Sequence, residues 1–213
     1  MQEKTRRAWI GRDAAVGIVI ALWLAYTVIQ TLCVVFKVAD SWAAAVGFVP
    51  GLLAVGVLLA GGFSAEECYL RVRRLSWAGL AVLVAVAALA WAAVLPFGAW
   101  QGWNWLAALV YAPASGVAQE LFFRSALLPA MHQALSRKRR APALLLHAVL
   151  FGLWHIAPLF LGAPLWAVAA VMLVPFVCGM GWGWQVRRDR TVIWAMVQHS
   201  LIWVVGLQFP MPD

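Results

Sequence analysis

The six residues Gln-Glu-Leu-Phe-Phe-Arg at positions 119–124 place a carboxylate and a guanidinium inside a run that is otherwise apolar. Glu120 is the one carboxylate within a predicted membrane segment, since the other acids fall in tails and loops. A charge at bilayer depth costs roughly 2.5–3.5 kcal/mol on insertion scales, so it is retained mainly where it is paired and functional. Arg124 lies one helical turn later and can neutralise Glu120 on the same face. We therefore expect the functional residues to gather around Glu120.

The composition is that of an integral membrane protein. Of the 213 residues, 65% are hydrophobic and 11% are charged, whereas about 25% are charged in soluble domains. The first apolar run is too long for a signal peptide and is interpreted as a retained anchor helix. The sequence predicts a single integral membrane domain over 1–213, an all-α bundle of about seven transmembrane helices. The predicted segments are 14–36, 42–62, 77–97, 103–135, 142–161, 164–186 and 191–209.

The basic residues predict the orientation. Nearly all of the 16 lysines and arginines fall in the N-terminal tail and in the loops after the second, fourth and sixth segments, whereas the opposite loops contain only Lys37. Cytoplasmic loops carry the excess of lysine and arginine, so the N-terminus is predicted to be cytoplasmic. This placement explains the net charge of +8 without nucleic acid. The expected setting is the inner membrane of a bacterium, with the lipid bilayer and a protein or peptide substrate as partners and the oligomeric state left open.

Several single residues carry local expectations. Pro113 and Pro129 predict kinks or ends within the fourth segment. Small-residue steps, Gly56/Ala60 and Gly179/Gly183 among them, permit close helix packing. Tryptophans near the predicted boundaries, including Trp103 and Trp182, are typical of interfacial belts. The three cysteines are scattered and predict no disulfide framework, and Cys33 and Cys178 are interpreted as core residues.

Two histidines fall at the depth of Glu120. At 1.5 Å per residue from the predicted cytoplasmic boundary, Glu120 lies roughly 14–16 Å deep, His199 about 12 Å and His155 about 20 Å. A carboxylate can take a proton from water, and an imidazole can share that task or protonate the leaving amine. The second imidazole can stabilise an oxyanion, while Arg124 keeps Glu120 ionised. His132 and His147 are interpreted as structural.

At these residues the sequence resembles the CPBP (CAAX protease and bacteriocin-processing) family of glutamic intramembrane proteases, over about residues 103–205. Three family patterns, EExxxR, FxxxH and HxxxN, are matched in order by Gln119-Glu120 with Arg124, Phe151 with His155, and His199 with Trp203. The resemblance implies hydrolysis of a peptide bond near the C-terminus or in a membrane-proximal segment of another membrane-associated or C-terminally tagged protein. The implied roles are Glu120 as the base, His155 as its partner oriented by Phe151, His199 as the oxyanion stabiliser and Arg124 as the ion-pair support.

Two positions depart from the family pattern. Gln119 replaces the first glutamate, which in the family is thought to activate water together with the histidine of the second motif. A neutral amide cannot act as a base, so either Glu120 has taken the role or this member does not hydrolyse. Trp203 replaces the asparagine that, with its histidine, resembles an oxyanion hole.

Other readings remain open at this point. No cofactor is expected, but a zinc protease would use Glu120, His155 and His199 as ligands of suitable type, although HExxH is absent. A rhomboid-like serine protease is disfavoured because the sequence around Ser115 lacks the first glycine of GxSG. A non-catalytic membrane scaffold or immunity factor is favoured by Gln119 and Trp203. A proton-coupled transporter is disfavoured because no internal repeat is evident.

Overall fold

The computed structural model describes residues 8–38, 40–94, 102–135 and 140–206, and every regular element within them is a helix. This confirms the all-α prediction. Two of the elements, η1 and η2, are π-helical. In chain order the elements are α1 (Arg12–Val35), α2 (Asp40–Ala60), α3 (Trp77–Val94), η1 (Ala107–Tyr111), α4 (Ala112–Glu120), η2 (Leu121–Leu127), α5 (Leu128–Ala134), α6 (Arg140–Leu153), α7 (Ala157–Phe160), α8 (Leu165–Asp189) and α9 (Ile193–Gly206).

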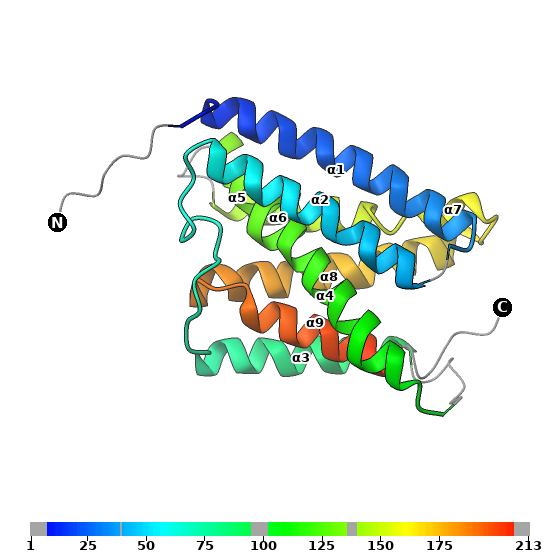
Figure 1. Cartoon of the computed structure of the whole chain (residues 1–213). Helices are drawn as coiled ribbons and strands as arrows, with labels where there is room; N and C mark the ends of the chain where they lie inside the picture. The colour runs from blue at the N-terminus through cyan, green and yellow to red at the C-terminus, as the bar shows by residue number, and fades with distance from the viewer. Residues whose placement is uncertain (1–7, 39, 95–101, 136–139, 207–213) are drawn as a thin grey trace.

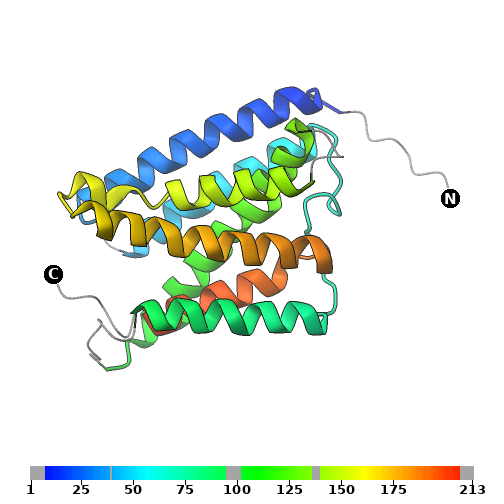
Figure 2. The ribbon, with the colours of Figure 1, turned by 180° about the vertical axis from the view of Figure 1, so that it is seen from behind.

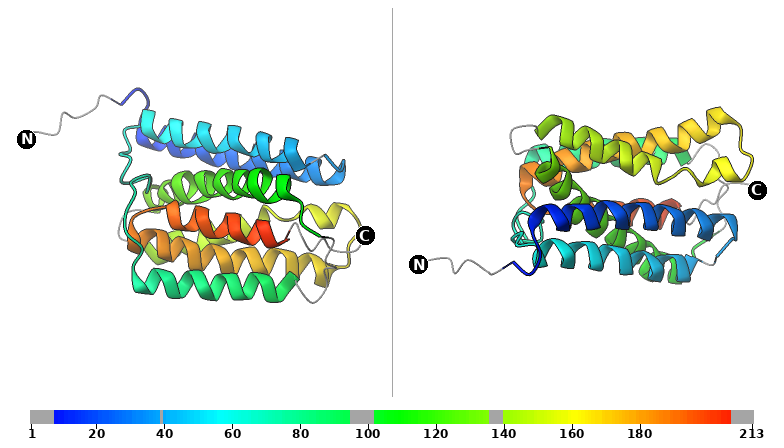
Figure 3. Two further views of the ribbon diagram at one scale, coloured as in Figure 1. Left: turned by 60° about the horizontal axis from the view of Figure 1, so that its bottom comes forward. Right: turned by 90° about the horizontal axis from the view of Figure 1, so that it is seen from above.

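The helices form one bundle with an oblique central element. Helix α1 packs on α2, α6 packs on α8, and α3 packs on both α8 and α9. The run η1–α4–η2–α5 crosses the bundle obliquely in Figure 1, and α4 packs against α2 and α9. The view from behind shows α6 and α8 side by side (Figure 2), and Figure 3 shows the bundle from two other sides. The segment around residues 119–124 therefore lies inside the bundle.

The outer surface of the bundle is apolar, as expected for an integral membrane protein. Three described helical stretches are long and apolar enough to cross a membrane: 12–35, 141–160 and 165–189. Three shorter apolar helices cover 47–60, 77–89 and 193–204. Large apolar side chains such as Leu24, Leu52 and Leu173 are more than half exposed, which suits contact with lipid. The count of seven spans and the cytoplasmic N-terminus stay predictions.

The predicted fourth segment contains one continuous helical run that alternates between π-helix and α-helix from η1 to α5. Pro113 and Pro129 lie in the first turns of α4 and α5, where a missing N–H is tolerated. The departures from α-helix are the π-helical stretches η1 and η2, which precede these prolines. The predicted ends of the third and seventh segments, at 97 and 209, lie outside the described residues.

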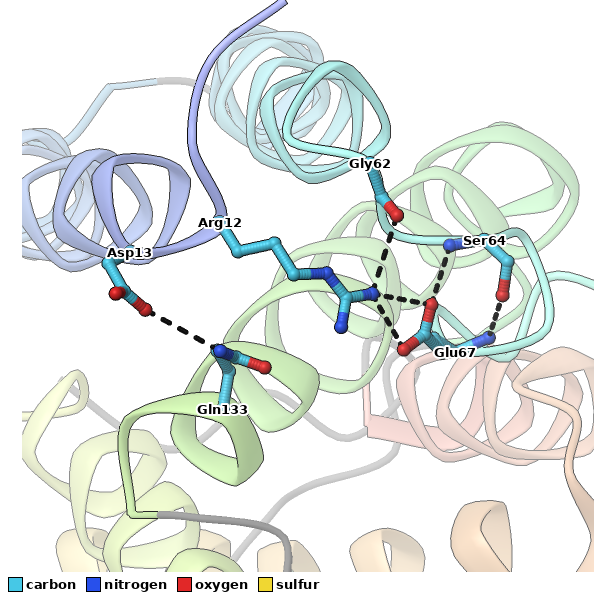
Figure 4. A network of polar contacts seen from close by, with 6 residues as sticks. All are labelled: Arg12, Asp13, Gly62, Ser64, Glu67 and Gln133. Carbon is cyan, nitrogen blue, oxygen red and sulfur yellow. Dashed lines mark hydrogen bonds and ion pairs between the residues drawn. The ribbon is translucent and has the colours of Figure 1, made fainter. Parts of the chain in front are cut away.

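Basic residues of the N-terminal end and of two loops pair with the neighbouring acids Glu66 and Glu67, and Figure 4 shows the contacts of Arg12. Arg12 Nη2 lies 2.7 Å from both carboxylate oxygens of Glu67 and donates to the Gly62 carbonyl. Burial alone would raise the pKa of Glu67, but Arg12 and the Ser64 N–H together hold that pKa below its usual value. The neighbouring Glu66 pairs with arginines from the loops after the second and sixth segments, Arg71, Arg73 and Arg190. Six basic residues of the N-terminal tail and of the loop after the fourth segment lie outside the described residues: Lys4, Arg6, Arg7, Arg137, Lys138 and Arg139.

Close helix packing is confirmed at one predicted step and is wrong at another. A Cβ at Gly179 would lie 3.2 Å from the Ala148 Cα, so α8 approaches α6 closely there. A Cβ at Gly56 would meet nothing within 4 Å. A close contact that the sequence reading did not single out is at Gly116, where a Cβ would lie 2.6 Å from the Ser200 amide nitrogen of α9.

Replacing Gly116 by alanine is expected to lower the free energy of unfolding by about 1–3 kcal/mol, because the added methyl group overpacks the contact between α4 and α9. The matched control is Gly56→Ala, which adds the same methyl group to a helix position with open space around it. Alanine is the better helix former by up to about 1 kcal/mol, so the control should be neutral or stabilising. Thermal unfolding of the purified proteins in detergent measures both, and equal shifts would contradict the packing argument.

Candidate functional site

A fully buried ion pair lies where helix α4 ends. Glu120 is the last residue of α4, and Arg124 lies inside the π-helical η2 that follows. Arg124 Nε is 3.1 Å from Glu120 Oε2, and both side chains have no exposed surface. Single π-helical turns inside α-helices are frequent at functional sites. The ion pair expected from the spacing of four residues is present at the centre of the bundle.

His199 of α9 joins this pair through the other carboxylate oxygen. His199 Nδ1 is 2.7 Å from Glu120 Oε1, and Trp203 Nε1 donates to His199 Nε2 over 3.1 Å. An indole nitrogen can only donate, so Nε2 must be the acceptor. The ring proton therefore lies on Nδ1 and is donated to the carboxylate. His199 is a neutral imidazole in this arrangement, and both of its nitrogens are engaged.

Aromatic rings enclose the guanidinium of Arg124. Its central carbon lies 4.1 Å from the centre of the Phe151 ring and 5.0 Å from that of Trp182. Such cation–π contacts are stronger where water is excluded. The Trp182 ring also stacks on His199, with ring centres 4.7 Å apart. Trp182 is buried, so its assignment to an interfacial belt was wrong.

His155 lies just beyond the end of α6, and one of its ring nitrogens has no hydrogen-bond partner among the described residues. Its Nδ1 is 2.9 Å from the Phe151 carbonyl oxygen. A carbonyl only accepts, so Nδ1 carries the proton and Nε2 keeps its lone pair. The ring packs edge-on against Phe151, with centres 5.1 Å apart, and the centre of the Phe151 ring is 6.3 Å from that of His199. The two histidines thus share Phe151 as a common wall, and no hydrogen bond among the described residues joins His155 to Glu120.

The donor set does not fit a zinc ion. Among the described residues, no three histidine, cysteine, aspartate or glutamate side chains are grouped so that they could hold a metal. Both nitrogens of His199 have partners already, and Glu120 faces Arg124 and His199. The zinc alternative requires Glu120, His155 and His199, and these described residues are therefore not arranged as a ligand shell.

A cavity of about 330 Å³ lies beside Gln119 rather than beside Glu120. Gln119 lines this cavity, and its Oε1 is buried without a hydrogen-bond partner among the described residues. Adjacent residues on a helix point about 100° apart, and Glu120, which does not line the cavity, is fully buried. The position where the family pattern has its first glutamate thus presents an amide to the cavity.

Sequence reasoning missed the contribution of α1 to this site. Tyr26, Gln30 and Cys33 of α1 line the cavity, although the helix was interpreted as an anchor and Cys33 as core. Their spacing of four and three residues places them on one helix face, and a tyrosine followed by a glutamine in an apolar run was the available signal. The hydrogen bond from Trp203 to His199 was also missed, although residues four apart lie on the same helix face.

The fold and the site define a helical membrane protein with an enclosed polar centre. Residues 99–205 match the family model described as type II CAAX prenyl endopeptidase Rce1-like. The match covers half of the chain and includes every residue from Gln119 to Trp203, and the chain belongs to this protease family. The resemblance seen in the sequence is confirmed. No curated protein and no solved structure matches the chain.

Proposed function

We propose that the protein is an intramembrane endopeptidase that hydrolyses a peptide bond of a membrane-associated or C-terminally tagged protein. The observation that carries the proposal is the buried contact of 2.7 Å between His199 and Glu120, within a network that includes Arg124 and Trp203. A charged network at membrane depth is costly and is retained mainly for function. Its residues all lie in the part of the chain that matches a protease family.

In the proposed reaction, water attacks the carbonyl carbon of the scissile bond. The proton leaves water for Glu120 or for the free Nε2 of His155, and it is then delivered to the nitrogen as the C–N bond breaks. Each carboxylate oxygen has two lone pairs, so Glu120 Oε1 can accept from water as well as from His199. The Phe151 carbonyl orients His155 so that Nε2 is its accepting nitrogen.

The role proposed for His199 changes with its tautomer. An oxyanion contact needs an N–H donor, and His199 Nε2 accepts the indole N–H of Trp203 instead of carrying a proton. We therefore assign His199 to holding Glu120 in place. Trp203 lies one helical turn beyond His199 and lines the cavity, and its single indole N–H is donated to His199 Nε2, so we assign Trp203 to holding His199 in place.

A second candidate is a non-catalytic member of the family that binds a membrane segment without cleaving it. The observation in its favour is that the amide of Gln119 lines the cavity while Glu120 has no exposed surface. Such a protein would keep the fold and the cavity but would have no base in contact with the bound segment.

One comparison separates the two candidates. Cells producing the wild type, Glu120→Gln or Gln119→Glu at equal levels are compared for newly generated termini in their membrane proteins by mass spectrometry. An endopeptidase gives termini with the wild type that disappear with Glu120→Gln. A non-catalytic member gives none with the wild type, and Gln119→Glu, which places a carboxylate at the cavity, is expected to generate them. If the wild type generates new termini and Glu120→Gln generates the same ones, Glu120 is not the base.

A further inference from the structure

The cavity reaches the surface at the end of the bundle opposite the arginine residues. Helix α1 has 24 residues and is therefore about 36 Å long at 1.5 Å per residue. Arg12 at its start bonds Glu67, whereas Lys37 and Val38, just past its other end, are exposed and line the cavity. The two ends of α1 lie at opposite ends of the bundle in Figure 1. Because basic loops remain in the cytoplasm, the mouth of the cavity is predicted to lie on the non-cytoplasmic side.

The inner end of the cavity is suited to a peptide group. Gln119 is 5% exposed, and its Oε1 has no hydrogen-bond partner in the part of the chain that the structure describes, so a ligand that offers an N–H at this depth would satisfy it. The same carboxamide carries an NH₂ group that can donate to a carbonyl. Gln30 and Ser115 add hydrogen-bonding groups along the wall. A backbone amide offers both the donor and the acceptor that this wall needs.

The outer end of the cavity selects for charge. Lys37 is the single charged side chain among the described residues that line the cavity, and no acid lines it. A cationic ligand would meet a like charge there, whereas an anionic group would meet a partner. Tyr26, Trp154 and Trp203 give the rest of the wall an aromatic character, which suits apolar side chains. The volume of about 330 Å³ is at the lower end for ligand pockets, so a short segment fits.

We propose that this cavity binds a short extended peptide segment that enters from the non-cytoplasmic side, with a backbone amide at Gln119 and an acidic group at Lys37. The identification of that segment as a substrate rests on the proposed function. Binding itself requires only the cavity and does not depend on hydrolysis.

The chain carries its own reporter for the side of entry. Cys33 lines the cavity and is half-buried, whereas Cys68 and Cys178 are buried. Burial raises the pKa of Cys68 to about 12, so this thiol stays protonated and unreactive at neutral pH. A membrane-impermeant maleimide is applied to right-side-out and to inside-out membrane vesicles that contain the full chain. We expect labelling in right-side-out vesicles only, and its loss in Cys33→Ser. Labelling of Cys33 confined to inside-out vesicles, or none from either side, would overturn the proposal.

The second measurement tests the ligand chemistry. A short apolar synthetic peptide with an acidic residue at one end, and its counterpart with lysine at that end, are tested for protection of Cys33 from the maleimide. The acidic peptide should protect at a concentration about tenfold lower, and Lys37→Glu should reverse the preference. Equal protection by both peptides, or no protection by either, would overturn the proposal.

The same protection assay in His155→Ala keeps the two proposals apart, because His155 does not line the cavity. Protection without any cleavage in the wild type would refute the proposed protease function and leave the binding proposal standing. Cleavage by the wild type without protection by the acidic peptide would refute the binding proposal and leave the protease function standing.

Discussion

Replacing Arg124 by methionine is expected to lower the free energy of unfolding by about 3–5 kcal/mol, because it leaves the carboxylate of Glu120 buried without its partner. Both side chains are fully buried, and Arg124 Nε lies 3.1 Å from Glu120 Oε2. The substitution also removes the cation that packs on Phe151 and Trp182. Denaturant unfolding of the purified protein in detergent measures the loss.

The control is the double variant Glu120→Gln/Arg124→Met, in which neither charge remains. Replacing both members of a buried ion pair by neutral groups of similar size is often neutral or even stabilising, so the double variant should regain most of the lost stability. A double-mutant cycle over the wild type, the two single variants and the double variant gives the coupling energy. A double variant as unstable as Arg124→Met would show that packing, and not the uncompensated charge, causes the loss. If the stable double variant cleaves no substrate, the loss of activity comes from the missing carboxylate and not from unfolding.

The parts of the site that depend on sequence spacing could be predicted. Glu120 and Arg124 are four residues apart on one helical run, so their contact is local and follows from the spacing alone. The approach of His199 to Glu120 could be predicted from similar depths along two membrane helices, because depth is set by the number of residues from the boundary. The structure shows both contacts.

What could not be predicted depends on how far each helix is rotated about its axis. Gln119 and Glu120 are adjacent, and the sequence does not say which of them is turned toward a cavity. The π-helical η2 begins directly after Glu120, and its wider turn is not encoded in any apolar pattern that period counting detects. Trp182 was misread for the same reason, since its position along α8 indicated a boundary while its side chain points into the bundle.

The fold, like the site, could be predicted where it depends on position along the sequence and could not where it depends on which helices pack together. Hydropathy located each apolar segment because a run of apolar residues is a one-dimensional signal. It did not show that α1 supplies part of the cavity wall, because that depends on which helices become neighbours. Gly116 was not singled out as a contact for α9, since a lone glycine in a helical run signals close packing only once its partner helix is known.

Replacing His155 by alanine is expected to lower the cleavage rate by about 10²–10⁴-fold, the usual contribution of a general acid or base. Within the described part of the chain, His155 Nε2 has no hydrogen-bond partner, whereas both ring nitrogens of His199 are engaged. His155 lies past the end of α6 and is only half-buried, so we expect a much smaller effect on stability than on the rate. A peptide that spans a cleavage site found in the comparison of membrane-protein termini serves as the substrate in proteoliposomes.

The matched control for this substitution is His147→Gln in α6, the helix that ends just before His155. His147 is fully buried two turns earlier, and its ring lies 3.4 Å from the position of a Cβ at Gly183 in α8, so its role is to fill the contact between α6 and α8. Cleavage per folded molecule should persist in this variant even if its unfolding temperature falls. The opposite result, with cleavage retained in His155→Ala and lost in His147→Gln, would remove His155 from the reaction. Glu120 would then have to accept the proton from water without help from an imidazole, since His199 has no free lone pair to offer.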